Sequence, residues 1–434
     1  MKRIKQIFSL EANDVTGQVW FFVLFIFILA LSVRLTLVFM GGMQGIGKGA
    51  ESVNIAISLL SNGTYADAYG VNIGPTAHCL PLHPLIVAGL LKLFGQDFGG
   101  GLALRVMASS AAALGYALMP VVATVWRMGL LPGVASGLLG ALLPLNFWGQ
   151  TCGVFDAPLT FLALTILCCM LGRYWSARSF TVRGGLGVGV VAGLACLLNS
   201  AILPVLCVWG GTGIWRFSEQ RRAFLRFIAA MASVVVLLQA PWGIRNLFVL
   251  GGMVWTRSNF GLELHLSNND HATASAEENV RTRWFAVEHP TLSEVERQKV
   301  RALGELRYHA EKRAQALQWI RSNPRRFMRL SLERMGYFWF PPMLRWWQTA
   351  FEAMITLGGL GGLIVLARRR NDAFWAIGAI FTSYSAIYMI IQVSPRYRFP
   401  VEPFLLLLSC YLITTLRSGE KHDSLVASCG GKAE

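Results

Sequence analysis

The chain has 434 residues, of which 54% are hydrophobic and only 14% are charged. Soluble globular proteins carry about 25% charged residues, so this composition excludes an ordinary soluble domain and indicates a polytopic membrane protein. The net charge of +16 would suggest nucleic-acid binding in a soluble protein. In a membrane protein it is explained by Lys and Arg in cytoplasmic loops, and we expect no nucleic-acid partner. The eight cysteines follow no metal-ligand spacing, so we expect them to behave as small hydrophobic residues.

The first predicted membrane span covers residues 19–40 and follows the basic sequence MKRIKQIF. It is too long for the core of a signal peptide and lacks a small-residue cleavage site, so we expect a retained anchor with a cytoplasmic N-terminus. Hydrophobic runs predict the remaining spans, about ten in total. These lie at 99–122, 132–149, 157–172, 186–199, 201–215, 226–246, 348–366, 373–392 and 400–416.

Basic residues support this path through the membrane, because Lys and Arg gather in the connections assigned to the cytoplasm. The short outer connections are nearly free of them, except for SPRYR at 394–398. Both termini are therefore predicted to be cytoplasmic. The predicted organisation is an N-terminal transmembrane module (1–246) with a first outer loop (41–98), an outer loop region (247–345), and C-terminal helices with a cytoplasmic tail (346–434).

Two acidic residues lie on the outer side. In GAESVNIAISLLSNG (49–63) the apolar residues recur at helical spacing, which predicts a helix on the membrane surface with Glu51 in its first turn. A helix N-terminus favours a carboxylate, so Glu51 could also be a simple helix-start acid. Asp156, in GQTCGVFDAP, lies in the outer turn between the third and fourth spans. Locally it resembles a helix N-cap, but it emerges on the same membrane face as Glu51.

The rest of the first outer loop contains GPTAHCLPLHPLIVAGLLKLFG (74–95), in which a second surface helix is predicted from Pro84 to Gly95. His78 and His83 lie on the same side of the membrane. Two histidines are too few ligands for a metal site, and interfacial loop histidines are the simpler explanation. We predict no metal site and no cofactor, and leave a divalent-metal requirement open.

The second outer loop begins with a polar and aromatic segment, MVWTRSNFGLELHLSNNDH (253–271). Amides and a guanidinium are suited to holding a sugar or a phosphate, although SNND alone is typical of an ordinary turn. The candidate groups in this segment are Arg257, Asn259, Glu263, Asn268 and Asn269. A charged helix is predicted further on, over residues 293–322.

The sequence SPRYRFPVEP (394–403) directly precedes the last apolar run and contains Arg396 and Arg398. Guanidinium groups bind phosphate with paired donors, but the two arginines could also anchor the last helix at the interface. The candidate ionisable groups gather at one membrane face. A transporter usually places its polar site near the midplane, so this asymmetry favours an enzyme that acts on a lipid head group.

The order of these features resembles the GT-C superfamily of membrane glycosyltransferases. It combines a carboxylate in the first outer loop, the GPTA…PLHPLIVAGLLKLFG sequence, a large outer loop before the last spans, and RYRFPVEP before the last helix. It is similar in particular to the polyprenyl-phosphate-dependent aminoarabinose transferase and protein mannosyltransferase group. The resemblance implies an all-α, GT-C-like bundle of about ten transmembrane helices with an outward-facing loop region.

The resemblance further implies an inverting transfer of a sugar from a polyprenyl-phosphate donor to a lipid, glycan or protein acceptor. It places this reaction at the periplasmic face of a bacterial inner membrane. Glu51 stands where the family has a general base, although the family more often has Asp there, and Asp156 matches a second loop acid. Whether Glu51 or Asp156 is the base stays open at this point.

The other candidate residues are assigned to the donor phosphate or to the remaining substrate contacts. The phosphate group comprises Arg396, Arg398 and Arg257, and the substrate contacts comprise Tyr397, Asn259, Glu263, Asn268, Asn269 and His83. Two alternatives remain, namely a flippase or transporter of lipid-linked glycans, and a non-catalytic membrane subunit.

Overall fold

The computed structural model describes the backbone of residues 13–41, 50–143, 147–343 and 345–430, and the side chains of 17–41, 50–143, 149–343 and 345–417. Within these ranges the chain is helical, and its only β-type pairs are two isolated bridges. The predicted all-α fold is confirmed. The basic sequence at 1–12 and part of the first outer loop, 42–49, lie outside the described residues.

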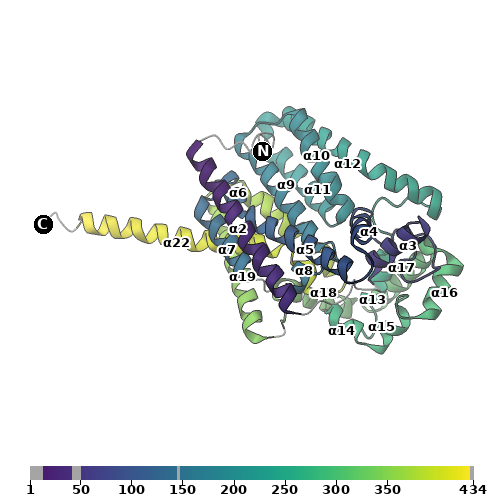
Figure 1. Cartoon of the computed structure of the whole chain (residues 1–434). Helices are drawn as coiled ribbons and strands as arrows, with labels where there is room; N and C mark the ends of the chain where they lie inside the picture. Colours follow the sequence, from purple (N-terminus) through teal and green to yellow (C-terminus); the bar gives the residue numbers. More distant parts are fainter. Residues whose placement is uncertain (1–12, 42–49, 144–146, 344, 431–434) are drawn as a thin grey trace.

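Long helices form a bundle, and α22 extends from one end of it (Figure 1). Its elements are α2 (Asn13–Met40), α5 (Phe98–Ala117), α6 (Met119–Val125), α7 (Leu130–Leu142), α8 (Phe147–Thr151), α9 (Ala157–Ala177), α10 (Val182–Leu198), α11 (Ile202–Arg216), η1 (Ser218–Gln220), α12 (Arg221–Leu250), α19 (Trp346–Arg368), α20 (Ala373–Ala379), the π-helical η2 (Ile380–Tyr384), η3 (Ile387–Met389), α21 (Pro395–Arg398) and α22 (Glu402–Gly430).

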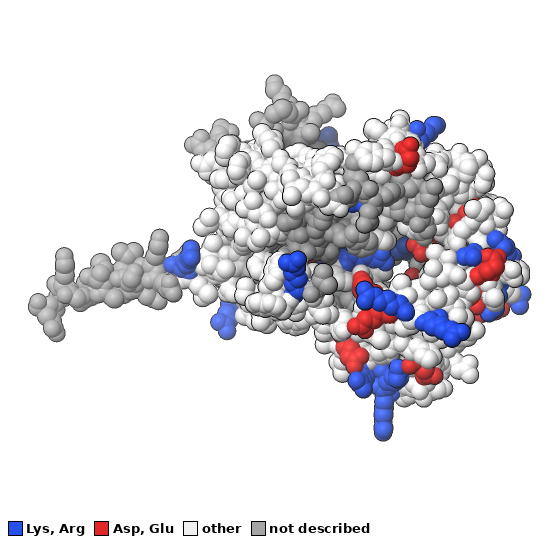
Figure 2. Space-filling model, turned by 60° about the horizontal axis from the view of Figure 1, so that its bottom comes forward, with Lys and Arg blue, Asp and Glu red and all other residues white. Residues whose placement is uncertain are grey.

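Shorter helices cluster at the other end of the bundle (Figure 1). The first outer loop supplies α3 (Glu51–Asn62) and α4 (Leu82–Phe94), so both helices predicted there are present. The second outer loop supplies α13 (Phe260–Ser267), α14 (Ala276–Val280), α15 (Arg283–Glu288), α16 (Glu294–Leu303), α17 (Glu305–Ser322) and α18 (Pro324–Trp339). We call helices α13 to α18 the outer unit. Charged side chains gather on this end of the molecule, and the described surface of the bundle carries few in the same view (Figure 2).

Five described helical segments are long and apolar enough to cross a membrane, which agrees with a membrane protein. They are Gly17–Met40, Phe98–Val125, Ala157–Ala177, Ser218–Leu250 and Trp346–Arg368. The predicted number of ten spans is not confirmed. Three other expected spans correspond to shorter apolar helices, Leu130–Leu142, Val182–Leu198 and Ala373–Met389.

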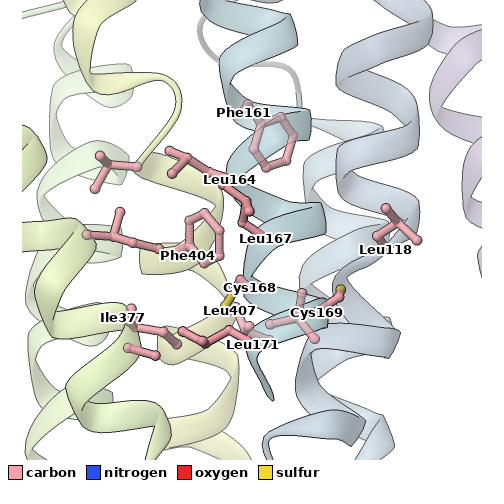
Figure 3. Close-up of a cluster of buried hydrophobic side chains, with 14 of the residues drawn as sticks. Leu118, Phe161, Leu164, Leu167, Cys168, Cys169, Leu171, Ile377, Phe404 and Leu407 are labelled. Carbon is pink, nitrogen blue, oxygen red and sulfur yellow. The ribbon is translucent and has the colours of Figure 1, made fainter. Parts of the chain in front are cut away.

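The apolar core of the bundle is centred on α9. Phe161, Leu164 and Leu167 of this helix are fully buried and lie between α5 and α6 on one side and α20 and α22 on the other (Figure 3). Cys168 and Cys169 are buried in the same core. They act as small hydrophobic residues, as predicted from the apolar run around them.

Close packing of α10 against α12 depends on glycine. A Cβ atom added at Gly185 would lie 2.3 Å from the carbonyl oxygen of Phe227, and one at Gly189 would lie 2.8 Å from that of Met231. Small residues let two membrane helices approach until their backbones touch. The repeated glycines of residues 184–193, GGLGVGVVAG, indicate such close packing. Gly187, on the same helix, has no atom within 4 Å of the equivalent position.

This difference gives a matched pair of substitutions. Gly185→Ala should destabilise the protein by about 1–3 kcal/mol, because the added methyl group overpacks the helix contact. Gly187→Ala should leave the stability unchanged or raise it slightly, because the methyl group meets no neighbour and alanine favours helix. Unfolding of the purified protein in mixed micelles with increasing sodium dodecyl sulfate measures both. Equal behaviour of the two variants would contradict the packing argument.

The outer unit is fastened to the segment that precedes α21. Val393 forms a parallel bridge with Ser275, with Ala276 N–H donating to Val393 O at 2.8 Å and Val393 N–H to Ala274 O at 2.9 Å. On either side, Ser394 Oγ donates to Glu277 Oε1 at 2.6 Å, and Asn279 Nδ2 donates to Gln392 Oε1 at 2.9 Å. The backbone leading to α21 is therefore held by α14 and its preceding loop.

Candidate functional site

The site forms where the turn between α8 and α9 meets the two helices of the first outer loop. Ser52 Oγ donates to the carbonyl oxygen of Val154 at 2.6 Å. His83, at the start of α4, bonds through Nε2 to the carbonyl oxygen of Gly153 at 3.2 Å. These contacts bring the first turn of α3, where Glu51 lies, beside the turn that ends at Asp156. Burial lowers the pKa of His83, and the negative charge of Asp156 acts in the opposite direction.

The two predicted acids differ in their surroundings. Glu51 is the first residue of α3 and is half-buried, and no hydrogen-bond partner for its carboxylate is found among the described residues. Asp156 directly precedes α9, and its Oδ2 atom accepts from Asn199 Nδ2 at 2.9 Å and from Thr160 Oγ1 at 3.3 Å. Asp156 is therefore oriented by the protein, whereas Glu51 is available to a ligand.

Arg257 reaches the same region from the loop before α13. Its Nε donates to the carbonyl oxygen of His78 at 2.9 Å, and a terminal nitrogen lies 3.8 Å from Cys79 Sγ. Burial acts to lower the pKa of Arg257, but Cys79, Asp156 and Glu263 together hold that pKa above its ordinary value. The guanidinium is thus a permanent cation in an acidic environment.

Arg396 contacts two aromatic rings. Its Cζ atom is 4.0 Å from the ring centroid of Phe155 and 4.9 Å from that of Tyr397, and one terminal nitrogen donates to the Tyr397 hydroxyl at 2.9 Å. Its Nε is buried and has no hydrogen-bond partner among the described residues. Burial acts to lower the pKa of Arg396, but Tyr397, Glu51 and Glu263 hold it above its ordinary value. Tyr397 is itself stacked on Tyr388, with ring centroids 4.8 Å apart.

Glu263, on α13, adds a third acid. It accepts a hydrogen bond from Asn259 Nδ2 at 3.4 Å. Burial raises the pKa of Glu263, and Glu51 raises it further, while Arg257 and Arg396 act against this shift. We define the charged cluster as Glu51, Asp156, Arg257, Glu263 and Arg396. Its members come from four separate parts of the chain and act on one another electrostatically.

Two other predicted substrate contacts, Asn268 and Asn269, are engaged within the protein. Asn268 Nδ2 donates to the carbonyl oxygens of Leu264 at 2.8 Å and Ile390 at 3.0 Å, and its Oδ1 accepts from the buried Arg334 at 3.2 Å. Asn269 Nδ2 donates to the carbonyl oxygens at the end of α13, and its Oδ1 accepts from the backbone of His271 at 2.8 Å. These contacts end α13 and join it to the bundle.

Arg398 lies apart from the charged cluster. It is 1% exposed and forms an ion pair with Glu352, which is also 1% exposed, with an N–O distance of 2.9 Å. It also donates to Thr356 Oγ1 at 2.9 Å. Residues two apart on a helix point about 200° apart, so α21 directs Arg396 and Arg398 to opposite sides. The two arginines are close in sequence, but the helix directs their side chains into different surroundings.

The ion pair predicts a specific pattern of stability. Arg398→Met should destabilise the protein by about 3–5 kcal/mol, because Glu352 would be left buried without its cation. The double variant Arg398→Met/Glu352→Leu should recover much of that loss, because neither charge then remains unpaired. Unfolding in mixed micelles measures both. A fully stable Arg398→Met protein would contradict this structural role.

Sequence reasoning missed a buried group of aromatic and imidazole side chains behind the charged cluster. The Tyr69 hydroxyl lies 2.8 Å from His78 Nδ1 and 3.0 Å from His309 Nε2, and the ring of His289 contacts Tyr69 edge-on. Burial lowers the pKa of His78 well below its ordinary value, that of His309 to about 4, and that of His289 as well. The sequence shows His78 as a loop histidine near Tyr69, but His309, which contacts the same hydroxyl, lies 240 residues after Tyr69 in the chain.

These shifts make stability depend on pH. Because the folded histidines bind protons more weakly than the unfolded ones, their contribution is fully present above about pH 6.5 and is lost as the pH falls toward the folded pKa values. The melting temperature in detergent should therefore drop between pH 7.5 and pH 5. His309→Gln should reduce this drop, whereas the exposed His271→Gln should not. An identical pH dependence in the His309 variant and the wild type would contradict the argument.

Among the described residues, no group of three or more His, Cys, Asp and Glu side chains is arranged to hold a metal ion. The charged cluster offers two cations, aromatic surface and, in Glu51, a carboxylate with no hydrogen-bond partner in the described part of the chain.

The arrangement of the bundle with its outer unit is similar to that of solved archaeal oligosaccharyltransferases. The oligosaccharyltransferase from Archaeoglobus fulgidus in its apo form matches with a TM-score of 0.55 and 11% identity, over 95% of this chain and 52% of that one. Archaeal AglB from the same organism, in complex with an inhibitory peptide and a dolichol-phosphate, matches with a TM-score of 0.53 and 11% identity over the same shares. The form with Zn and sulfate gives 0.55 and 10%, over 94% and 51%.

This chain therefore spans about half the length of the solved structures that it matches. No family model matches the sequence. No curated protein matches it either. At such low identity the likeness shows the fold, and activity has to be argued from the site.

Proposed function

We propose that this chain is an integral membrane glycosyltransferase that moves a sugar from a polyprenyl-phosphate-linked donor to an acceptor at the outer face of the membrane. The observation that carries the proposal is the charged cluster. In it the carboxylate of Glu51, which has no hydrogen-bond partner among the described residues, shares one environment with Arg257 and Arg396. The fold shared with an oligosaccharyltransferase supports it. The proposed location is a bacterial inner membrane, with the site facing the periplasm.

In the proposed reaction, an acceptor hydroxyl attacks the anomeric carbon of the donor sugar from the side opposite the phosphate. The new carbon–oxygen bond forms as the bond to the phosphate oxygen breaks, and the configuration at the anomeric carbon inverts. The hydroxyl proton passes to Glu51, because a positioned carboxylate can act as general base. The bonding electron pair leaves with the phosphate of the carrier lipid.

Leaving-group charge is stabilised by fixed cations in this scheme. Arg396 is suited to it because its guanidinium contacts the rings of Phe155 and Tyr397, while its Nε has no partner among the described residues. Arg257 is held by the carbonyl oxygen of His78 and supplies a second cation. Arg398, which is paired with Glu352, is given a structural role in this proposal.

The remaining acids have different roles. Asp156 is oriented by Asn199, which suits a carboxylate that positions the acceptor or supports the base. Glu263, whose pKa is raised by burial, suits a carboxyl group that donates a hydrogen bond to a phosphate or sugar oxygen. The choice among lipid, glycan and protein acceptors is left to the surface of the outer unit.

A transfer assay tests this assignment. Membranes containing the full chain are incubated with a panel of radiolabelled polyprenyl-phosphate sugars. Glu51→Gln should lower the turnover rate by about 10²–10⁴-fold, because it removes the base while keeping size and hydrogen bonding. Arg396→Gln should lower both turnover and donor affinity. Glu311→Gln, which changes a half-exposed carboxylate on the outer unit, is the matched control and should remain active.

Each variant is first shown to have the expression level and melting temperature of the wild type. Full activity of Glu51→Gln would reject Glu51 as the base, and loss of activity in Asp156→Asn would then assign that role to Asp156. Movement of labelled lipid across the bilayer without any sugar transfer by the wild type would reject the enzyme proposal in favour of a transporter.

A further inference from the structure

A cavity of about 410 Å³ lies at the opposite end of the bundle, where the end of α11 meets the turn between α19 and α20. Its walls include Trp215, Arg216, Arg370, Phe374 and Trp375. The volume is in the range of about 300–1,000 Å³ that is usual for small-molecule sites. The charged cluster does not use these residues.

Helix lengths place this cavity far from the candidate active site. Helix α9 begins directly after Asp156 and runs for 21 residues, which corresponds to a rise of about 30 Å. At its far end Ser176 O accepts from Arg127, and the neighbouring Trp126 O accepts from Asn371 Nδ2 at 2.9 Å. The pattern of basic residues in the sequence predicts that this end faces the cytoplasm.

Two guanidinium groups at the cavity have N–H donors that make no hydrogen bond among the described residues. Arg216 Nε is paired with Asp372 Oδ1 at 2.8 Å, which fixes the plane of the guanidinium. Its terminal nitrogens, and the whole guanidinium of Arg370, have no partner in the part of the chain that the structure describes. Because Asp372 neutralises only one of the two cations, the cavity wall keeps a net positive charge, which suits an anion.

The turn that carries Arg370 is firmly held. The N–H of Arg370 donates to Ala367 O at 3.0 Å and that of Asn371 to Leu366 O at 2.9 Å. The Asn371 side chain bonds both Trp126 O and the N–H of Ala373, each at 2.9 Å. The cation is therefore presented by an ordered backbone.

Two tryptophan residues, Trp215 and Trp375, indicate that the cavity lies at the level of the lipid head groups. Trp215 is 67% exposed and contacts Trp375 edge-on at 5.3 Å between ring centroids. Exposed indole rings at the end of membrane helices are typical of the membrane–water interface. Basic pockets between helices on the cytoplasmic side are suited to anionic lipid head groups.

We propose that this cavity binds the phosphate head group of an anionic phospholipid, with Arg216 and Arg370 contacting the phosphate and the two tryptophans contacting the glycerol region. The proposal is independent of glycosyl transfer. It assigns the chain a lipid-phosphate site at the end of the bundle opposite the charged cluster.

Native mass spectrometry of the purified full chain in neutral detergent tests the site. The protein is titrated with dioleoyl-phosphatidylglycerol and, separately, with dioleoyl-phosphatidylcholine. The wild type should bind phosphatidylglycerol more tightly, and Arg370→Gln should weaken its tightest binding about fivefold. Arg370→Lys, which keeps the charge, should lose less. Arg368→Gln removes an equal charge two residues away from a side chain outside the cavity, and should have no effect.

Equal binding of the two lipids by the wild type would overturn the proposal, as would an equal loss in Arg368→Gln and Arg370→Gln. Displacement of phosphatidylglycerol by millimolar glycerol 1-phosphate would assign the site to a soluble phosphate compound and overturn the lipid assignment. An unchanged melting temperature of Arg370→Gln in the same detergent shows that weaker binding is not a loss of folding.

Discussion

The candidate site depends on one buried carboxylate, that of Glu305 at the start of α17. It accepts hydrogen bonds from the Thr76 hydroxyl, from the backbone N–H of Ala77 at 2.7 Å and from Ser258 Oγ at 2.6 Å. Burial raises the pKa of Glu305, and these three donors oppose the shift.

The carboxylate of Glu305 thus joins the first outer loop to the second, which are separated by about half of the chain. This junction helps to fix Arg257, the neighbour of Ser258, beside the turn that ends at Asp156, together with the hydrogen bonds from Ser258 N–H to Ala77 O at 3.0 Å and from Arg257 Nε to His78 O at 2.9 Å. Arg245 reinforces the junction from the end of α12 by donating to the carbonyl oxygens of Thr76 and Tyr65 at 2.7 and 2.6 Å.

Much of the architecture could be predicted because hydrophobicity and helix signals are local. The helix that begins at Glu51 was predicted correctly from its apolar spacing. The predicted charged helix at 293–322 is instead two helices, α16 and α17, because Gly304 takes a positive φ of 76° that ends the first of them. The span predicted at 373–392 is likewise interrupted by the π-helical and 3₁₀ segments after α20. Gly304 is a local stop signal that the charge pattern overlooks, whereas a change of helix type within an apolar run leaves no mark in a hydropathy pattern.

The site was only partly predictable for the same reason. The types of residue in the charged cluster were recognisable from the sequence, because charged groups at the ends of apolar runs are costly to bury and stand out. Their partners were not. Ser52, Asn199 and Phe155 look like ordinary helix and turn residues, and each gains its importance from a contact made across the fold. Arg396 and Arg398 show the converse case, in which neighbours in sequence are directed to different surroundings by four residues of helix.

The attachment of residues 392–394 to α14 links the backbone before Arg396 to the outer unit. Four hydrogen bonds tie this short segment to residues 274–279 of the outer unit, and Arg396 follows only two residues later. The outer unit therefore helps to position the proposed phosphate-binding cation. If a ligand on the aqueous side shifts α14, we expect the backbone before Arg396 to shift as well. Binding at the two surfaces would then be coupled, and such a coupling is equal in both directions.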